Sequence, residues 1–227
     1  MAALDLTRRT IAVIPGTGNI GSRLAFQYAK AGLSVVVGSR DAAKAQKIAA
    51  QISKETQSSS VKGLTNAEAA ASGDIIFWNP AGPLKDREEL LKSLASHLVD
   101  KIIIDVTNVL YFFGESEWGR ISSTLLNRDS LGAPARWTTA FKATIAHFLR
   151  EDLPDVNNPH TTFVAGDDPE AVATTIALVE TIPGFKGAKA GPLENSRIVE
   201  LLGPRWLIEL DKLNAGGKFS TYWKLGV

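Results

Sequence analysis

A glycine-rich segment between an apolar run and an amphipathic segment constrains this chain more than any other feature. Residues 16–21 read Gly-Thr-Gly-Asn-Ile-Gly and directly follow the apolar run at 11–14. Residues 19–31 carry apolar side chains at helical spacing, and Gly32 follows as a helix stop. A strand, a G-x-G-x-x-G turn and a helix in this order are typical of a dinucleotide-binding βαβ unit. The segment therefore predicts a parallel α/β fold that binds a phosphate-bearing ligand.

Each glycine of this loop has its own expected role. Gly16 permits the tight turn, Gly18 lets the backbone approach a pyrophosphate, and Gly21 allows the helix to pack closely on the strand. The start of the helix supplies N–H groups and a favourable dipole for the phosphates. The residues that we expect to bind the cofactor here are Gly16, Thr17, Gly18, Asn19, Ile20 and Gly21.

Short apolar runs alternate with helical segments along most of the chain. Strands are predicted at 11–14, 35–37, 61–64, 74–78, 101–106, 136–141 and 161–165, with a short strand or loop at 185–190. Helices are predicted at 19–31, 41–52, 66–71, 84–98, 169–180 and 193–213. Residues 109–134 have weak periodicity and an aromatic cluster. The predicted fold class is α/β, a Rossmann-type doubly wound, mostly parallel sheet with a small C-terminal α/β portion.

Composition excludes several classes of function. The 25 basic and 24 acidic side chains leave a net charge of +1, so no nucleic-acid partner or anionic membrane surface is expected. No apolar run approaches the ~18 residues of a membrane span. The chain has no cysteine, and its three histidines lack metal-ligand spacing, so no metal site is expected. A cytoplasmic protein is the default expectation.

The end of the second predicted strand distinguishes NADP from NAD. An NAD site usually places an acidic side chain there to bind the ribose 2′-hydroxyl. This strand ends instead in Ser39 and Arg40, and Asp41 is better used as a helix cap. Because a guanidinium makes charge-assisted hydrogen bonds with phosphate, Ser39 and Arg40 favour the 2′-phosphate of NADP.

Further site residues are expected where later strands end. In doubly wound sheets, ligands bind outside the carboxyl ends of the strands. The fourth strand is followed by Asn79, Pro80 and Ala81, and the fifth by Thr107 and Asn108, which we expect to line the ribose and nicotinamide. An alternative interpretation is that these residues only terminate strands, since Asn and Pro are common in turns.

Five segments together resemble the NADPH-dependent reductases of coenzyme F420, a deazaflavin. They read IAVIPGTGNIGSRLA at 11–25, VVVGSR at 35–40, DIIFWNP at 74–80, IIIDVTN at 102–108 and GPLENSRIVELL at 191–202. The resemblance implies a homodimer, NADPH bound by the glycine loop with Ser39 and Arg40, and direct hydride transfer between nicotinamide and deazaflavin. The order of the predicted elements divides the chain into an NADP-binding Rossmann domain at 1–150 and a small C-terminal α/β region at 151–227, which we expect to supply substrate and dimer contacts.

The chain departs from the family pattern near the second substrate. The family commonly has His-Thr or Asn-Thr after the sixth strand, whereas here Phe141 is followed by Lys142 and Ala143. The fourth strand usually ends in a proline–tryptophan pair, and here it reads Phe77-Trp78-Asn79-Pro80.

Three hypotheses for the function remain open at this point. If the acceptor is a deazaflavin, ring stacking and orientation suffice, and Trp78 and Tyr111 are candidate substrate contacts, although core packing is the favoured interpretation of both rings. If the chain reduces a C=O or C=N bond of a small organic molecule, a proton donor is required, and Lys142 is the candidate catalytic residue. Tyr111 and His147 are weaker candidates for that role. The third hypothesis is a non-catalytic NADP sensor.

Overall fold

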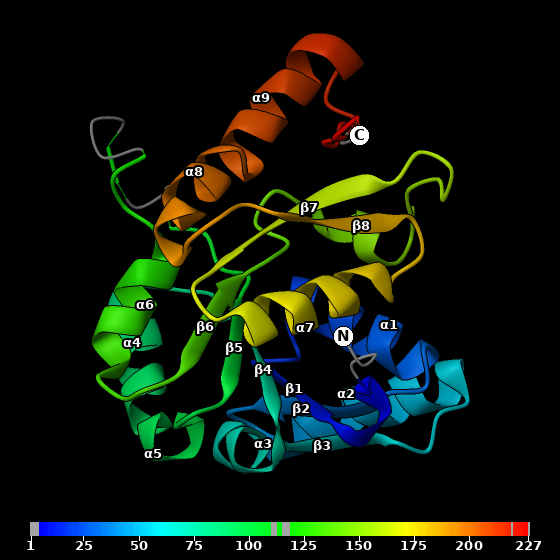
Figure 1. Cartoon of the computed structure of the whole chain (residues 1–227). Helices are drawn as coiled ribbons and strands as arrows, with labels where there is room; N and C mark the ends of the chain where they lie inside the picture. Colours follow the sequence, from blue (N-terminus) through cyan, green and yellow to red (C-terminus); the bar gives the residue numbers. More distant parts are fainter. Residues whose placement is uncertain (1–4, 110–112, 115–118, 219, 227) are drawn as a thin grey trace.

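The apolar runs of the sequence form the inner strands of one sheet in the structure, a computed structural model (Figure 1). It describes residues 5–109, 113–114, 119–218 and 220–226. Within these residues the sheet has eight strands in the order β3-β2-β1-β4-β5-β6-β7-β8. The strands are β1 (Thr10–Ile14), β2 (Ser34–Ser39), β3 (Val61–Thr65), β4 (Ile75–Trp78), β5 (Ile102–Asp105), β6 (Arg136–Thr139), β7 (His160–Gly166) and β8 (Phe185–Lys189).

Helices connect the strands and flank the sheet (Figure 1). The α-helices are α1 (Asn19–Lys30), α2 (Ala42–Thr56), α3 (Asn66–Ser72), α4 (Leu84–Ser93), α5 (Ala95–Leu98), α6 (Ser123–Leu131), α7 (Pro169–Glu180), α8 (Ser196–Leu201) and α9 (Pro204–Ala215). Short 3-10 turns are η1 (Leu6–Arg8), η4 (Ala146–Leu149) and η5 (Leu193–Asn195). The predicted Rossmann-type α/β class is confirmed.

Two hydrophobic clusters hold the helices on the sheet. Side chains of a strand alternate between its two faces, so β1 contributes Ile11 and Val13 to one cluster and Ala12 and Ile14 to the other. The first cluster includes apolar residues of α1, α2 and α7, and the second includes residues of α3 and α4. Strands buried on both faces are typical of parallel sheets covered by helices, which explains the continuous apolar runs in the sequence.

The sheet is parallel except at one pair. Strands β1 to β6 pair in parallel, β6 and β7 pair antiparallel with Thr138 opposite Gly166, and β7 and β8 are again parallel. The C-terminal strands thus extend the same sheet beyond β6. The division into 1–150 and 151–227 stays a prediction.

Strand β6 ends earlier than the sequence predicts, at Thr139 rather than at residue 141. Phe141 has a φ of +56°, in the left-handed region, so the chain turns out of the strand before Lys142. Both side chains are nevertheless buried, Phe141 at 2% and Lys142 at 0% exposure. The turn therefore places a lysine inside the protein instead of at a solvated strand end.

The helix predicted at 193–213 is wrong as a single element. The structure has η5, α8 and α9, with a break at Gly203. A Cβ at Gly203 would lie 2.6 Å from the Lys142 carbonyl oxygen and 2.8 Å from the Glu200 carbonyl oxygen. The next residue is a proline, which has no N–H to continue the helix. The predicted helix at 84–98 likewise divides into α4 and α5, and α6 was not predicted.

Candidate functional site

The glycine loop between β1 and α1 is shaped by close backbone packing. The Gly16 N–H donates to the Gly38 carbonyl at 2.7 Å, which holds the loop against β2. A Cβ at Gly16 would lie 2.8 Å from the Val13 carbonyl oxygen, and one at Gly21 would lie 2.7 Å from the Pro15 carbonyl oxygen. Since these contacts are with backbone atoms, the loop and helix keep this approach only with glycine at both positions.

Gly18 differs from its two neighbours in the loop. A Cβ added there would meet no protein atom within 4 Å, so the protein's own packing does not require this glycine. Gly18 is the N-cap of the 12-residue helix α1, and no side chain caps that helix. The open space and the free helix start fit a bound phosphate, because the first N–H groups of a helix are donors without intrahelical partners.

A pocket of about 330 Å³ lies beside this loop at the ends of β1 and β2. Its lining residues are Pro15, Thr17, Gly18, Ser39, Arg40, Asp41, Lys44, Asn79 and Ala81. Ser39 is buried, and its hydroxyl accepts a hydrogen bond from the Asp41 N–H at 3.2 Å. Asp41 caps α2 by accepting from the Lys44 N–H at 3.2 Å, as the sequence predicts.

Two cations, Arg40 and Lys44, converge on this pocket. Both are exposed, and among the described residues neither has an ion-pair partner. Such a pair suits a phosphate with two negative charges better than a ribose hydroxyl. Lys44 was missed from the sequence, although it follows Arg40 by four residues in the first turn of a capped helix.

A second pocket of about 350 Å³ continues from the first, because both are lined by Gly18, Asn79 and Ala81. Its other lining residues are Asn19, Ile20, Pro80, Arg87, Val106, Thr107, Asn108, Thr144, Ile145, Ala146 and Ile208. The two pockets form one cleft along the carboxyl ends of β1, β2, β4 and β5, where ligands of such sheets bind. The structure thus brings the predicted residues after β4 and β5 to the same cleft as the glycine loop.

Backbone and side-chain groups of the second pocket are fixed by hydrogen bonds. The Asn79 N–H donates to the Ile14 carbonyl at 2.7 Å. Thr107 donates to Asp105 Oδ1 from both its N–H and its hydroxyl, each at 2.7 Å. Asn108 Nδ2 donates to the Lys142 carbonyl at 3.1 Å. A ligand in this pocket therefore meets groups that are already oriented.

Among the described residues that line the second pocket, Arg87 alone carries a charged side chain. Nothing in the sequence indicated that Arg87 belongs to the site. It is buried, its Nε donates to the Gly82 carbonyl at 2.9 Å, and it lies on α4 one turn before Leu91 of the core. Burial lowers the pKa of Arg87, and the charges of Asp105 and Glu200 partly oppose this change. The guanidinium remains a fixed cation at ordinary pH.

Thr144 lines the second pocket and has a histidine behind it. Its hydroxyl lies 2.9 Å from His160 Nε2. His160 is fully buried among aromatic rings, and burial lowers its pKa to about 4. The imidazole is therefore neutral at neutral pH.

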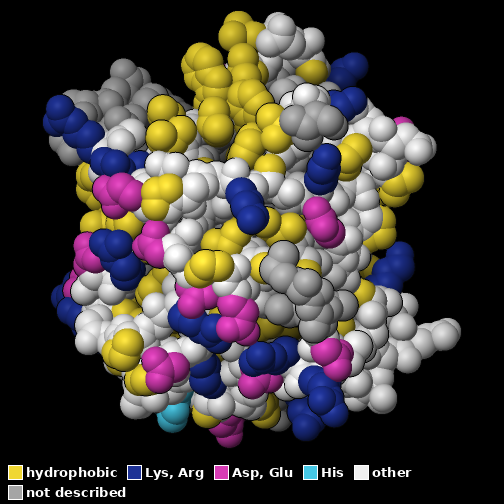
Figure 2. All heavy atoms as spheres, in the orientation of Figure 1, with side chains coloured by type: hydrophobic (Ala, Val, Ile, Leu, Met, Phe, Trp, Pro, Cys, Tyr) yellow, Lys and Arg dark blue, Asp and Glu magenta, His cyan; other side chains and the backbone are white. Residues whose placement is uncertain are grey.

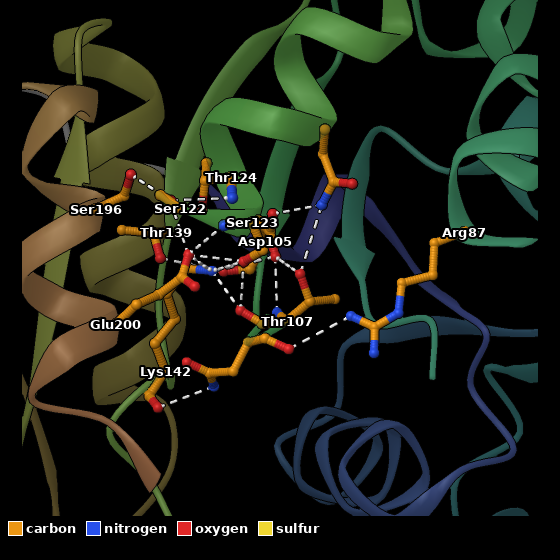
Figure 3. A network of polar contacts seen from close by, with 12 residues as sticks. Arg87, Asp105, Thr107, Ser122, Ser123, Thr124, Thr139, Lys142, Ser196 and Glu200 are labelled. Carbon is orange, nitrogen blue, oxygen red and sulfur yellow. Dashed lines mark hydrogen bonds and ion pairs between the residues drawn. The ribbon is translucent and has the colours of Figure 1, made fainter. Parts of the chain in front are cut away.

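Lys142, the predicted proton donor, lies deeper than expected. Its ammonium lines neither pocket and takes part in a buried polar network (Figure 3). It contacts Asp105 Oδ1 at 3.3 Å and Glu200 Oε1 at 3.1 Å, and donates to the Thr107 carbonyl at 2.5 Å. The catalytic role of Lys142 stays a prediction.

The two predicted aromatic contacts have different outcomes. Trp78 is fully buried in the cluster with Ile14 and Leu91, so its ring offers no exposed stacking surface. Helices α3 and α4 explain this placement, because their apolar residues belong to the same cluster and cover the face of β4 on which Trp78 lies. Tyr111 lies outside the described residues.

Glu200 has a different partner from the one the sequence indicates. Helical spacing predicts an ion pair between Arg197 and Glu200 on a solvated face. Arg197 instead pairs with Glu194 at 3.1 Å, and the Glu200 side chain is fully buried. The sequence also predicts that Trp206, Leu207 and Leu210 bury one face of the following helix. Leu207 is buried at 1% exposure and Leu210 is half-buried, whereas Trp206 is 53% exposed, so the prediction is wrong for Trp206.

Comparisons with known proteins agree with this geometry. The family model described as NADP oxidoreductase, coenzyme F420-dependent, matches residues 10–109. The F420-dependent NADP reductase of Methanothermobacter thermautotrophicus strain Delta H is 32% identical over 213 residues, covering 86% of each chain. The chain belongs to this family. The resemblance predicted from the five sequence segments is confirmed.

Two further comparisons are with a solved structure and with a longer relative. A solved structure from Arthrobacter sp. FB24, assigned as an F420-dependent NADP reductase, aligns with a TM-score of 0.76 at 21% identity, over 96% of this chain and 99% of that chain. The metalloreductase STEAP3 of Rattus norvegicus is 28% identical over 196 residues, 86% of this chain but 36% of its own length.

Within the described residues, every helix is too short or too polar to cross a membrane, and no acidic, histidine or cysteine cluster could hold a metal ion.

Proposed function

We propose that this NADP-dependent oxidoreductase transfers a hydride between NADPH and the deazaflavin coenzyme F420. One observation carries the choice of F420. Among the described residues that line the second pocket, Arg87 is the sole titratable side chain, and a guanidinium does not exchange protons near neutral pH. Hydride transfer between two planar rings depends on orientation and needs little acid–base help from the protein, which suits a pocket of this kind.

Different residues of the cleft would bind different parts of NADPH. The glycine loop and the start of α1 would hold the pyrophosphate, Ser39, Arg40 and Lys44 would hold the 2′-phosphate, and Asn79 to Ala81 would line the ribose. NADPH, when bound, supplies the hydride from C4 of its nicotinamide ring. Thr107, Asn108 and Thr144 would orient the rings within the second pocket, and Ile20, Val106 and Ile145 would exclude water from it.

Proton balance separates this reaction from the alternative. Reduction of F420 by NADPH consumes one proton, which solvent can deliver to a ring nitrogen of the deazaflavin. Reduction of a C=O or C=N bond instead requires a donor placed at the reacting atom. Lys142, the candidate donor, faces Asp105 and Glu200 rather than the pocket. The geometry therefore favours the deazaflavin as second substrate.

The experiment that tests this proposal is NADPH oxidation, followed at the nicotinamide absorbance, with purified protein and F420. FMN and a panel of imines and ketones serve as competing acceptors. We expect rapid reduction of F420 and slow or no reduction of the others. Reduction of an imine or ketone with F420 unchanged would overturn the proposal, and tight NADPH binding without turnover of any acceptor would indicate a sensor.

We also propose a homodimer that works in the cytoplasm, where NADPH is available. Large apolar side chains lie exposed on the last two helices, namely Ile198, Trp206 and Leu213. Figure 2 shows hydrophobic side chains gathered over the region of α9 in Figure 1. Exposed apolar patches of this kind often mark protein interfaces. Light scattering of the purified chain tests the proposal, and a monomer at micromolar concentration would contradict it.

A further inference from the structure

A cluster of buried charges lies directly behind the second pocket. Lys142, Asp105 and Glu200 are each fully buried, although they come from the turn after β6, the end of β5 and helix α8. Figure 3 shows their side chains converging between the strand ends and the C-terminal helices. Charges buried this deeply are costly unless they are paired and hydrogen-bonded, so the arrangement needs a reason.

The ammonium of Lys142 contacts both carboxylates and also the backbone of the pocket wall. It contacts Asp105 and Glu200, donates to the Thr107 carbonyl at 2.5 Å, and donates to Ser123 Oγ at 2.8 Å. Thr107 and its neighbour Asn108 line the second pocket. The lysine thus holds the pocket wall from behind while its own head group stays out of the pocket.

The two carboxylates are satisfied in different ways. Asp105 has neutral donors of its own, with Thr107 at Oδ1 and Asn127 Nδ2 at 2.8 Å from Oδ2. Glu200 Oε1 accepts from the Ser122 hydroxyl and from both the N–H and the hydroxyl of Ser123, each at 2.7 Å, whereas its Oε2 has no hydrogen-bond partner within the described structure. Because both oxygens of Asp105 are bonded and only one of Glu200 is, Glu200 is the carboxylate that depends more on Lys142, which also lies closer to it.

The main chain of Lys142 reaches the pocket as well. Its carbonyl accepts from Asn108 Nδ2 at 3.1 Å, and Gly203 packs against the same carbonyl so closely that a Cβ there would lie 2.6 Å away. Helix α9, which begins after Gly203, contributes Ile208 to the pocket. Lys142 is therefore the point at which β5, the β6 turn and the C-terminal helices meet.

We propose that Lys142 and Glu200 are a positioning pair for the nicotinamide end of the site. Their charges lock α8 onto the strand ends, and this fixes the Thr107 carbonyl and the Asn108 amide at the pocket. Lys142 acts through these groups and donates no proton to substrate. The inference rests on the proposed function for the identity of the pocket, and its test also uses a readout that is independent of F420.

Formal charge suggests the design of the test. Lys142, Asp105 and Glu200 alone have a formal sum of −1, and Arg87, on whose pKa both carboxylates act, adds the same +1 in every variant. Lys142→Met changes this sum to −2, Glu200→Gln changes it to 0, and the double variant restores −1. Removing one partner of a buried pair leaves the other uncompensated, while removing both is often tolerated. The double variant should therefore bind NADPH more tightly than Lys142→Met alone.

The experiment is a double-mutant cycle in the full chain, read by binding of NADPH and of 2′,5′-ADP. The second ligand carries the 2′-phosphate but has no nicotinamide. We expect Lys142→Met to weaken NADPH binding by roughly tenfold or more, and the double variant to recover most of that loss. Binding of 2′,5′-ADP should stay within about twofold throughout, because its pocket lies at β2. Lys186→Met and Glu194→Gln, on exposed side chains, are the matched controls.

Turnover of F420 provides the second readout. A positioning pair predicts that kcat recovers in the double variant with an unchanged pH profile, whereas a proton donor predicts that both variants without Lys142 stay equally slow. Equal loss of both ligands, or no recovery in the double variant, would overturn the inference. If Lys142→Met does not fold, the double variant and Glu200→Gln still decide it. If the wild-type chain does not reduce F420, the proposed function fails while the binding cycle remains decisive.

Discussion

Replacing Gly18 with alanine should weaken ligand binding with little effect on the stability of the protein. The φ of −88° and ψ of −178° suit alanine, and its Cβ would meet no protein atom within 4 Å. The expected structural cost is the loss of a better N-cap residue, about 0.5–1 kcal/mol. The methyl group would, however, occupy the space in which the pyrophosphate approaches the backbone. We expect NADPH binding to weaken by at least about tenfold, which corresponds to 1.4 kcal/mol.

Gly21→Ala is the matched control, since its Cβ would lie 2.7 Å from a backbone oxygen. Overpacking of this kind costs about 1–3 kcal/mol, and the better helix propensity of alanine returns about 1 kcal/mol. Calorimetric titration with NADPH and thermal unfolding without ligand measure both variants, because bound ligand would itself raise the Tm. Gly21→Ala should lower the Tm as well as the affinity. Wild-type affinity in Gly18→Ala would refute the placement of the pyrophosphate at this loop.

Three more outcomes follow from the same geometry. Arg40→Ala and Lys44→Ala should each weaken NADPH binding by about 1–2 kcal/mol while NADH binding stays unchanged, as titration with both cofactors would show; equal losses would exclude the 2′-phosphate role. Because burial lowers the pKa of His160 from near 6.5 to about 4, the unfolded chain alone binds this proton between those values, so stability should fall by up to about 3 kcal/mol as the pH drops from 7 to 4. His160→Gln should flatten that part of the urea-unfolding profile, and an unchanged slope would contradict the assignment. Leu213→Glu, at a side chain 80% exposed, should shift a dimer toward monomer in light scattering without lowering NADPH affinity.

The first pocket and the glycine loop beside it could be predicted because their determinants are local. Gly16, Gly18 and Gly21 act within one strand–turn–helix unit, and Ser39 and Arg40 follow at the end of the next strand. Periodicity and turn chemistry operate over the same short range, so they indicate both the elements and the ligand.

The charged network could not be predicted, because periodicity assumes that buried faces are apolar. In α8 the inward residues are Ser196, Val199 and Glu200, while Ile198 is exposed. The apolar pattern can indicate Val199, but it does not indicate the two polar residues that are buried beside it. The partners of Glu200 lie 77 and 58 positions earlier in the chain, at Ser123 and Lys142, and no local signal connects them.

The same network bears on the departure from the family pattern after the sixth strand. The family pattern leads us to expect a residue near the second substrate at this position. From the sequence, Lys142 is therefore predicted to be a proton donor in the site. The left-handed turn at Phe141 instead directs the lysine toward Glu200, and Thr144, two residues later, lines the pocket. The lysine therefore supports the pocket wall from behind, and its ammonium does not line the pocket. If Lys142 and Glu200 are the positioning pair that we propose, we expect a reductase with this lysine to keep its reaction only when a buried carboxylate accompanies it.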